Sequence, residues 1–206
     1  MFKWKEYIID KLILYKVIPQ EEADVYQFGL DCLSLKLLHC ISYLLIAVCL
    51  KLLPELIIIA CVLIPLRRNA GGYHARTRLG CYLFSCCFVF FILVVSAINM
   101  NQNVWWSAFV LSNVIIFSLC PLDNENKKLD LNERKHFRKK ALYILLSADF
   151  GSIILTMLHL YHVRNLVICG ISAAALLLVL HKISDLWNRK AIDEFINVLL
   201  QKSRDF

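Results

Sequence analysis

The sequence is poor in charge and lacks the composition of a soluble domain. Only 19% of its 206 residues are charged, whereas 59% are hydrophobic, and the mean hydropathy is +0.62. The excess of apolar residues lies in long runs, which is typical of membrane proteins. We therefore expect an all-α integral membrane protein with about six transmembrane helices and amphipathic interfacial helices at both ends.

Two other patterns are missing. A charged lead precedes the first long apolar run, which begins near Leu33, so we expect no cleaved signal peptide. The nine cysteines have no metal-ligand spacing, and the neighbours Cys86 and Cys87 do not form a Cys-x-x-Cys motif. We expect reduced thiols without a disulfide framework, most of them serving as small buried apolar residues.

Six apolar segments are candidates for crossing a bilayer, which takes roughly 20 residues of helix. The second is short and contains Glu55 and two prolines, which favours a re-entrant segment or one packed in a locally thinned bilayer. Amphipathic patterns at both ends predict surface helices. The expected organisation is an interfacial unit over 1–31, a six-helix transmembrane domain over 32–183 and an amphipathic helix over 184–206. The six segments are 33–50, 52–66, 79–98, 104–122, 141–160 and 166–183.

Lysine and arginine alternate between the loops. The loops assigned to one side hold 20 of them and the loops on the other side hold two, with Lys36 inside the first segment. This alternation predicts a multi-pass protein of the cell membrane with both termini in the cytoplasm. The net charge of +7 is therefore a topology signal, and we expect the lipid bilayer, and no nucleic acid, as a partner.

The stretch "RRNAGGYHARTRLGC" (67–81) interrupts the apolar pattern at the predicted cytoplasmic mouth of the second and third segments. A cysteine and a histidine suffice for acyl transfer through a thioester. Cys81 follows His74, Arg76 and Arg78 and stands near a helix start, where positive charge and the helix dipole favour a thiolate. The other thiols lie in apolar surroundings.

His74 and Cys81 are seven residues apart, about 10 Å along a continuous helix, so the chain between them has to bend. Gly71, Gly72 and Gly80 supply the conformational freedom for such a loop. Backbone N–H groups near Leu79–Tyr82 are candidates for an oxyanion hole. From the residues alone, an ordinary turn followed by a packed cysteine remains an alternative.

"RRNAGGYHARTRLGCYLFS" resembles the signature of the accessory gene regulator protein B family, membrane cysteine endopeptidases of Gram-positive quorum sensing. "CPLDNENKKLDLNERKHFRKK" is similar to the family's loop after the fourth segment. The resemblance covers nearly the whole chain, although only the His–Cys stretch is specific. Asn69 departs from the aromatic residue expected there. The resemblance implies His74 as the catalytic histidine and Cys81 as the nucleophile.

The resemblance also implies a substrate and a reaction. Family members remove the C-terminal part of a short, membrane-bound propeptide (accessory gene regulator D-like) and hold the remainder as a thioester. A cysteine or serine in the peptide then displaces the enzyme and leaves a cyclic thiolactone or lactone autoinducing peptide. No metal or cofactor is implied, and we expect a homodimer.

Further residues are candidates for supporting roles. Gly71, Gly72, Arg76 and Arg78 accompany the His–Cys couple, and Asp149 is costly inside the fifth segment, where it is a candidate partner of His74, His181 or Lys36. The basic loop ending in Lys139 and Lys140 is a topology anchor and a candidate site for the propeptide's acidic tail.

Two other classes compete with the peptidase. The intramembrane Asp149 and the serines near it fit a non-catalytic membrane peptide-binding or transport protein. A metal-handling protein is rejected, because the six histidines fall on opposite sides of the predicted membrane.

Overall fold

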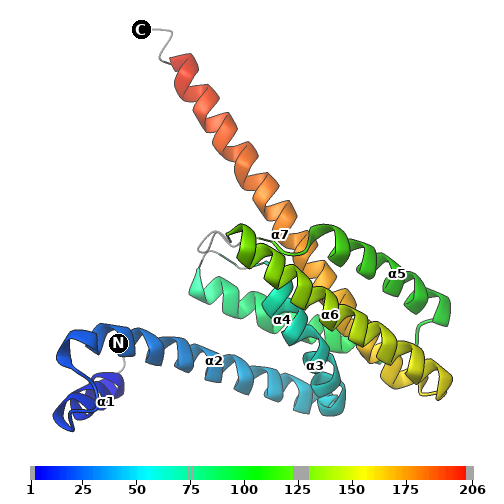
Figure 1. Cartoon of the computed structure of the whole chain (residues 1–206), viewed down its shortest axis with the longest axis horizontal. Coiled ribbons are helices and arrows are strands. Elements are labelled where there is room, and N and C mark those ends of the chain that lie inside the picture. Colours follow the sequence, from blue (N-terminus) through cyan, green and yellow to red (C-terminus); the bar gives the residue numbers. More distant parts are fainter. Residues whose placement is uncertain (1–2, 74, 76, 123–129, 203–206) are drawn as a thin grey trace.

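The computed structural model describes residues 3–73, 75, 77–122 and 130–202, and it is helical throughout apart from short connections (Figure 1). Its elements, in chain order, are α1 (Lys3–Leu14), the 3-10 turn η1 (Gln20–Glu22), α2 (Ala23–Leu50), α3 (Leu53–Ala70), α4 (Arg78–Ala97), α5 (Gln102–Leu119), α6 (Leu131–Met157) and α7 (Tyr161–Lys202).

Five helices in the described part of the chain are long and apolar enough to cross a membrane: α2 with the preceding turn, α4, α5, α6 and the part of α7 up to Trp187. The expected all-α membrane class is confirmed. The second of the six expected segments corresponds to α3, which is not one of these five helices. Its 18 residues span about 27 Å, but they include Glu55, Arg67 and Arg68.

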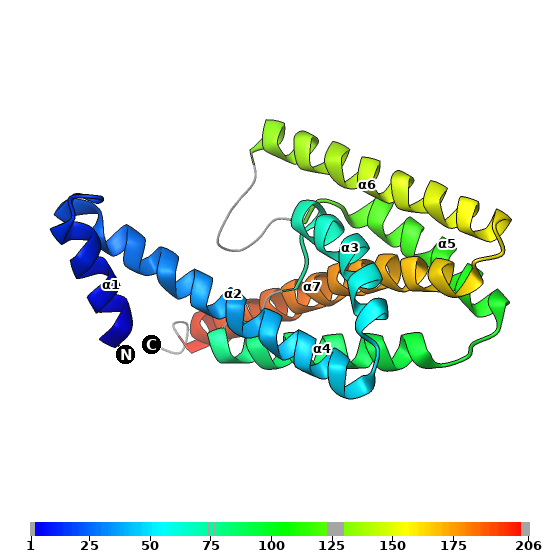
Figure 2. The same ribbon diagram turned by 90° about the horizontal axis from the view of Figure 1, so that it is seen from below.

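Helix α7 is the centre of the bundle, and α3 and α5 pack closely against it. More than half of its apolar stretch is buried. The view from below shows α3 between α6 and α2, with α4 on the other side of α7 (Figure 2). Helix α3 therefore packs against several helices on one side, while its other face, which includes Ile57 and Ile64, is exposed.

Small residues let α3 and α7 approach each other. A Cβ atom at Gly170 would lie 3.0 Å from the Cβ of Val62 and 3.1 Å from the carbonyl oxygen of Ile59. Buried Ala173, Ala174 and Ala175 continue the same close-packing stretch of α7. Membrane helices associate through such small residues, since lipid provides no hydrophobic force between them.

The bundle has two ends, and the connections alternate between them. The site end of the bundle is the one at which α3 finishes and α4 and α6 begin. The far end is the opposite one, at which α2 and α4 finish. Two clusters of buried apolar residues fill the interior. One holds Leu66, Ala70 and Ala141 near the site end, and the other holds Ala47 and Ile59 near the far end.

Helices α1 and α2 lie at the edge of the bundle. Only a small share of α2 is buried, and its N-terminal part projects away from the other helices together with α1 (Figures 1 and 2). The side chains that α1 and its connection bury are Ile9 and Ile18. The C-terminal half of α2 is the part that contacts the start of α4, through His39 and Ser42 on Tyr82.

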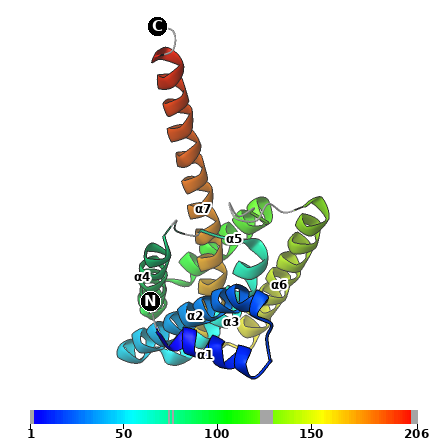
Figure 3. The same cartoon turned by 90° about the vertical axis from the view of Figure 1, so that its left-hand side faces the viewer.

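Helix bounds differ from the sequence expectations in three places. Helix α2 begins at Ala23 and runs through the expected boundary at 31. The polar residues before Leu33 can form helix, although they do not extend the apolar run from which the boundary was predicted. Helix α6 begins at Leu131, so half of the expected basic loop is helical. Helix α7 continues to Lys202 without a break at 184 and extends beyond the bundle (Figure 3).

Candidate active site at the start of helix α4

The connection between α3 and α4 begins with two glycines that the fold requires. Gly71 has φ +86° and ψ −164°, and a Cβ atom on it would lie 2.8 Å from the carbonyl oxygen of Leu122. The N–H of Leu122 donates to the carbonyl of Ala70 at 3.0 Å. A Cβ atom on Gly72 would lie 3.3 Å from the Cβ of Leu177. The twin glycines therefore allow the connection to pass between the end of α5 and the middle of α7.

Tyr73, the residue before the expected catalytic histidine, is held by three contacts. Its N–H donates to the carbonyl of Leu177 at 3.1 Å, and its own carbonyl accepts from Nη2 of Arg67 at 3.2 Å. Its ring meets the ring of Phe84 edge-on, with 4.9 Å between centroids. These contacts tie the connection to α7, α3 and α4, so the backbone leading into residue 74 has a defined position.

His74 and Arg76 themselves lie outside the described residues. Their neighbours Tyr73, Ala75 and Thr77 are described. The expected contact between His74 and Cys81 therefore remains a prediction.

Thr77 caps α4, a role that sequence reasoning missed. Its Oγ1 accepts a hydrogen bond from the N–H of Gly80 at 3.0 Å, and its carbonyl accepts one from the N–H of Cys81 at 2.9 Å. A threonine just before an apolar run is a recognised signal for a helix start, so the sequence contained the information. Gly80 lies inside α4, where a Cβ atom would come within 2.7 Å of Oγ1 of Thr77. It serves the cap rather than a hinge.

Cys81 is the fourth residue of α4 and is partly exposed. A thiolate there lies in the first turn of a helix, where the dipole favours negative charge. The cap uses backbone amides within Leu79–Tyr82, the stretch in which an oxyanion hole was expected. The amides of Gly80 and Cys81 donate to Thr77, and the amide of Tyr82 belongs to the regular helix ladder. Of these four backbone amides, that of Leu79 takes part neither in the Thr77 cap nor in the helix ladder.

Helix α2 brings polar groups to the same face of α4. Ser42 and Tyr82 share a hydrogen bond of 2.6 Å between their hydroxyls, and the rings of His39 and Tyr82 meet edge-on at 5.2 Å. Tyr43 of α2 lines a cavity together with Ser85 of α4 and Arg67 of α3. The spacing of residues 39, 42 and 43 places them on one helical face, which is the signal that could have indicated them.

Cys120, which directly follows α5, differs from Cys81 in its surroundings. It is 3% exposed, and burial raises the pKa of its thiol to about 11, partly opposed by the positive charge of Arg138. A buried neutral thiol is a poor nucleophile. Of these two cysteines at the site end, Cys81 is the partly exposed one, and it lies in the first turn of a helix.

The family model described as Accessory gene regulator B matches residues 5–181, which is most of the chain. The chain belongs to the accessory gene regulator B family. No curated protein and no solved structure matches it. Membership places the chain among membrane proteins that process accessory gene regulator quorum-sensing peptides.

The matched region contains Asp149, which packs toward α5. Its Oδ1 accepts a hydrogen bond from Nδ2 of Asn113 at 3.2 Å, and both side chains line a gap of about 360 Å³ between α5 and α6. Asp149 lies eight residues, about 12 Å, beyond Ala141, which shares a buried cluster with Ala70. The described contact of Asp149 is therefore with α5 and not with the connection at 71–77.

Lys139 and Lys140 are exposed on the first turns of α6. Nζ of Lys139 lies 5.8 Å from the centroid of the Tyr143 ring. Nearby Arg138 has a structural role, since its Nη2 donates to the carbonyl of Phe117 at 3.4 Å and its guanidinium covers the same residue's ring. The rest of the expected basic loop, residues 123–129, lies outside the described residues.

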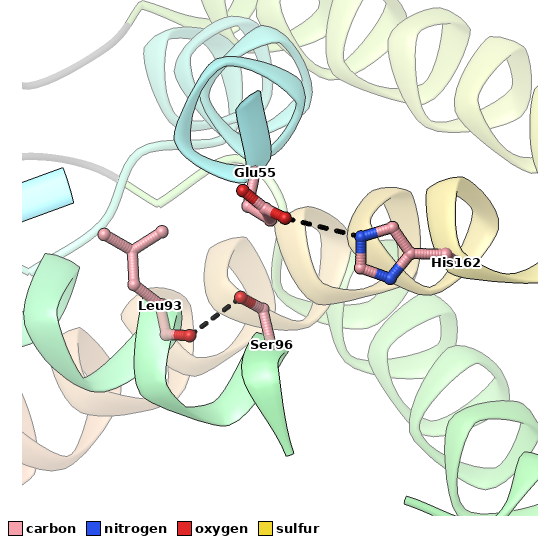
Figure 4. Close-up of polar contacts among 4 residues, drawn as sticks. All are labelled: Glu55, Leu93, Ser96 and His162. Atoms are coloured by element: carbon pink, nitrogen blue, oxygen red, sulfur yellow. Dashed lines mark hydrogen bonds and ion pairs between the residues drawn. The ribbon is translucent and has the colours of Figure 1, made fainter. Parts of the chain in front are cut away.

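The far end has a polar cluster of its own. Oε1 of Glu55 on α3 lies 3.5 Å from Nε2 of His162 on α7, near Ser96 of α4, whose hydroxyl donates to the carbonyl of Leu93 (Figure 4). Arg164 is buried and donates to Gln102 and Asn165. These contacts join the far ends of α3, α5 and α7, away from Cys81.

Proposed function

We propose that the chain is a membrane cysteine endopeptidase that cleaves and cyclises a quorum-sensing propeptide. The thiolate of Cys81 attacks the carbonyl of the scissile peptide bond, and His74 gives a proton to the departing amine of the C-terminal fragment. The N-terminal part stays on Cys81 as a thioester. A cysteine or serine within it then attacks the thioester, which closes the thiolactone or lactone ring and restores the Cys81 thiol.

The observation that carries the proposal is the position of Cys81. It occupies the first turn of α4 with its amide bonded to Thr77, and the residue before His74 is held by α3, α4 and α7. The family match agrees with peptide processing and covers both His74 and Cys81.

The site's place at one end of the bundle suits the chemistry. Water would hydrolyse a thioester before it could cyclise, so the site has to limit access of water to the acyl-enzyme. We place the site end at the cytoplasmic face of the cell membrane of a Gram-positive bacterium, on the basis of the lysine and arginine distribution. A propeptide lying on that face would reach Cys81 from the interface.

The exposed lysines of α6 fit a second part of the substrate. We propose that Lys139 and Lys140 bind the acidic C-terminal tail of the propeptide by charge complementarity. The sparsely buried surface of α2 is where we expect the second protomer of a homodimer, which crosslinking in liposomes would test.

Intact mass spectrometry of the protein in liposomes with its propeptide tests the reaction. Wild type should gain the mass of the peptide's N-terminal part, and hydroxylamine should remove it. Cys81→Ala should gain nothing, and His74→Ala should acylate far more slowly. Cys87→Ala removes an exposed thiol from the same helix and should behave as wild type.

Other outcomes separate the alternatives. Bound peptide without adduct or cleavage in wild type contradicts the peptidase and indicates a binding or transport protein. An adduct that persists in Cys81→Ala assigns the nucleophile to another cysteine.

A further inference from the structure

A cavity of about 110 Å³ lies among α2, α3, α4 and α7. Helices α3 and α4 contribute most of its wall, and α3 faces α4 with apolar side chains such as Ile59 and Leu63. No carboxylate lines it. It is separate from the larger gap between α5 and α6.

The cavity continues the face of α4 that holds Cys81. Its α4 wall includes Ser85, Phe88 and Ile92, which are spaced by three and four residues. Cys81 precedes Ser85 by four residues and so belongs to the same stripe, one turn, about 6 Å, nearer the site end. The cavity therefore begins one turn below the nucleophile.

Polar groups occur in the wall nearest Cys81. The hydroxyl-bearing side chains of Tyr43 and Ser85 line this part of the wall, and Arg67 beside them donates to the carbonyl of Tyr73 in the connection above. The remaining wall is aliphatic and aromatic. A group entering from Cys81 would pass this polar rim and end in an apolar space.

We propose that this cavity binds the apolar side chain of the peptide residue whose carbonyl carbon is bonded to Cys81. This assignment rests on the proposed function. A cavity of roughly 150 Å³ in another protein holds benzene, so about 110 Å³ fits one side chain of the size of leucine and is tight for phenylalanine. Burial of that side chain would position the thioester carbonyl over the start of α4.

Paired substitutions on α4 test the proposal by changing the size of the cavity. Val89→Phe fills it, and the matched control Val94→Phe adds the same bulk outside its lining, where Val94 is 36% exposed. Phe88→Ala enlarges it, and the matched control is Phe90→Ala at a residue that is 50% exposed. Each protein is acylated in liposomes with propeptides carrying alanine, leucine, phenylalanine or tryptophan at the acyl residue.

In wild type, leucine should be acylated at least about tenfold faster than alanine, since one or two methylene groups in an apolar pocket give such ratios. Val89→Phe should lower the leucine-to-alanine ratio about tenfold or more while alanine still reacts. Phe88→Ala should raise the rates for phenylalanine and tryptophan relative to leucine. The two controls should keep the wild-type ratios.

Unchanged ratios of acylation rates in both cavity variants would overturn the proposal and indicate that the cavity holds lipid or is only a packing defect. In that case an adduct on Cys81 would still leave the proposed function standing. Equal changes in cavity variants and controls would also overturn the proposal. If wild type forms no adduct with any substrate, the proposed function itself fails.

Discussion

Replacing Gly71 by alanine should displace the connection that leads to His74. The backbone of Gly71, at φ +86° and ψ −164°, lies in a region that is essentially restricted to glycine. Forcing another residue into such a region costs of order 1–3 kcal/mol. The new Cβ atom would also lie 2.8 Å from the carbonyl oxygen of Leu122, a backbone atom that cannot rotate away.

The magnitude follows from these two effects. Relief of the clash requires the segment after α5 to move, which breaks the 3.0 Å hydrogen bond from Leu122 to Ala70 and costs about 1 kcal/mol more. The total is about 2–4 kcal/mol in favour of a displaced connection. Because about 1.4 kcal/mol is a factor of ten, the acylation rate of Cys81 should fall by between about thirtyfold and about a thousandfold.

The assay is single-turnover acylation of Cys81 in liposomes, followed by intact mass. Gly29→Ala is the matched control, because Gly29 lies in α2 with nothing within 4 Å of its would-be Cβ atom. That control should keep the wild-type rate and should stabilise α2 slightly, by about 0.5–1 kcal/mol. A folded Gly71→Ala protein that acylates within about threefold of wild type would refute the reasoning.

Three further predictions follow from the site end. Thr77→Val removes the cap of α4 and should lower the acylation rate by roughly fivefold, which corresponds to the typical cap loss of about 1 kcal/mol. Thr77→Ser should restore the rate in the same assay, and no loss in the valine variant would argue against the cap. Replacing Lys139 and Lys140 by glutamate should raise the KM for propeptide at low salt, and the increase should disappear at high salt because salt screens the charges. A KM that is unchanged at every salt concentration speaks against tail binding. Iodoacetamide at pH 8 should label the partly exposed Cys81 at the start of α4 far faster than Cys120, because a raised pKa of about 11 leaves roughly one thousandth of the Cys120 thiol ionised; mass mapping that finds both equally labelled would contradict the burial of Cys120.

The fold was largely predictable, but helix ends were not. Apolar runs of sufficient length indicate membrane helices whatever their neighbours, which is why the segments matched α2 to α7 in order. The same reasoning missed helical residues that are polar. Ala23 begins α2 and Leu131 begins α6, because hydrophobicity shows where a helix can lie in lipid and not where its hydrogen bonds start.

The site was predictable in part. The positive stretch, the twin glycines and Cys81 at a helix start are local features, and the structure places Cys81 in the first turn of α4. The cap by Thr77 was also local and was overlooked. The packing of α3 against α7 was not local, since it depends on the close approach at Gly170.

Residues close together in the chain were enough to establish the membrane class and the order of the helices, and they made Cys81 the candidate nucleophile. Only the tertiary structure decided how the connection before His74 is held. Tyr73 donates to the carbonyl of Leu177, more than one hundred positions away, and Gly71 fits against Leu122. Such contacts form when α5 and α7 pack beside α3, and no periodicity or composition within 67–81 specifies them.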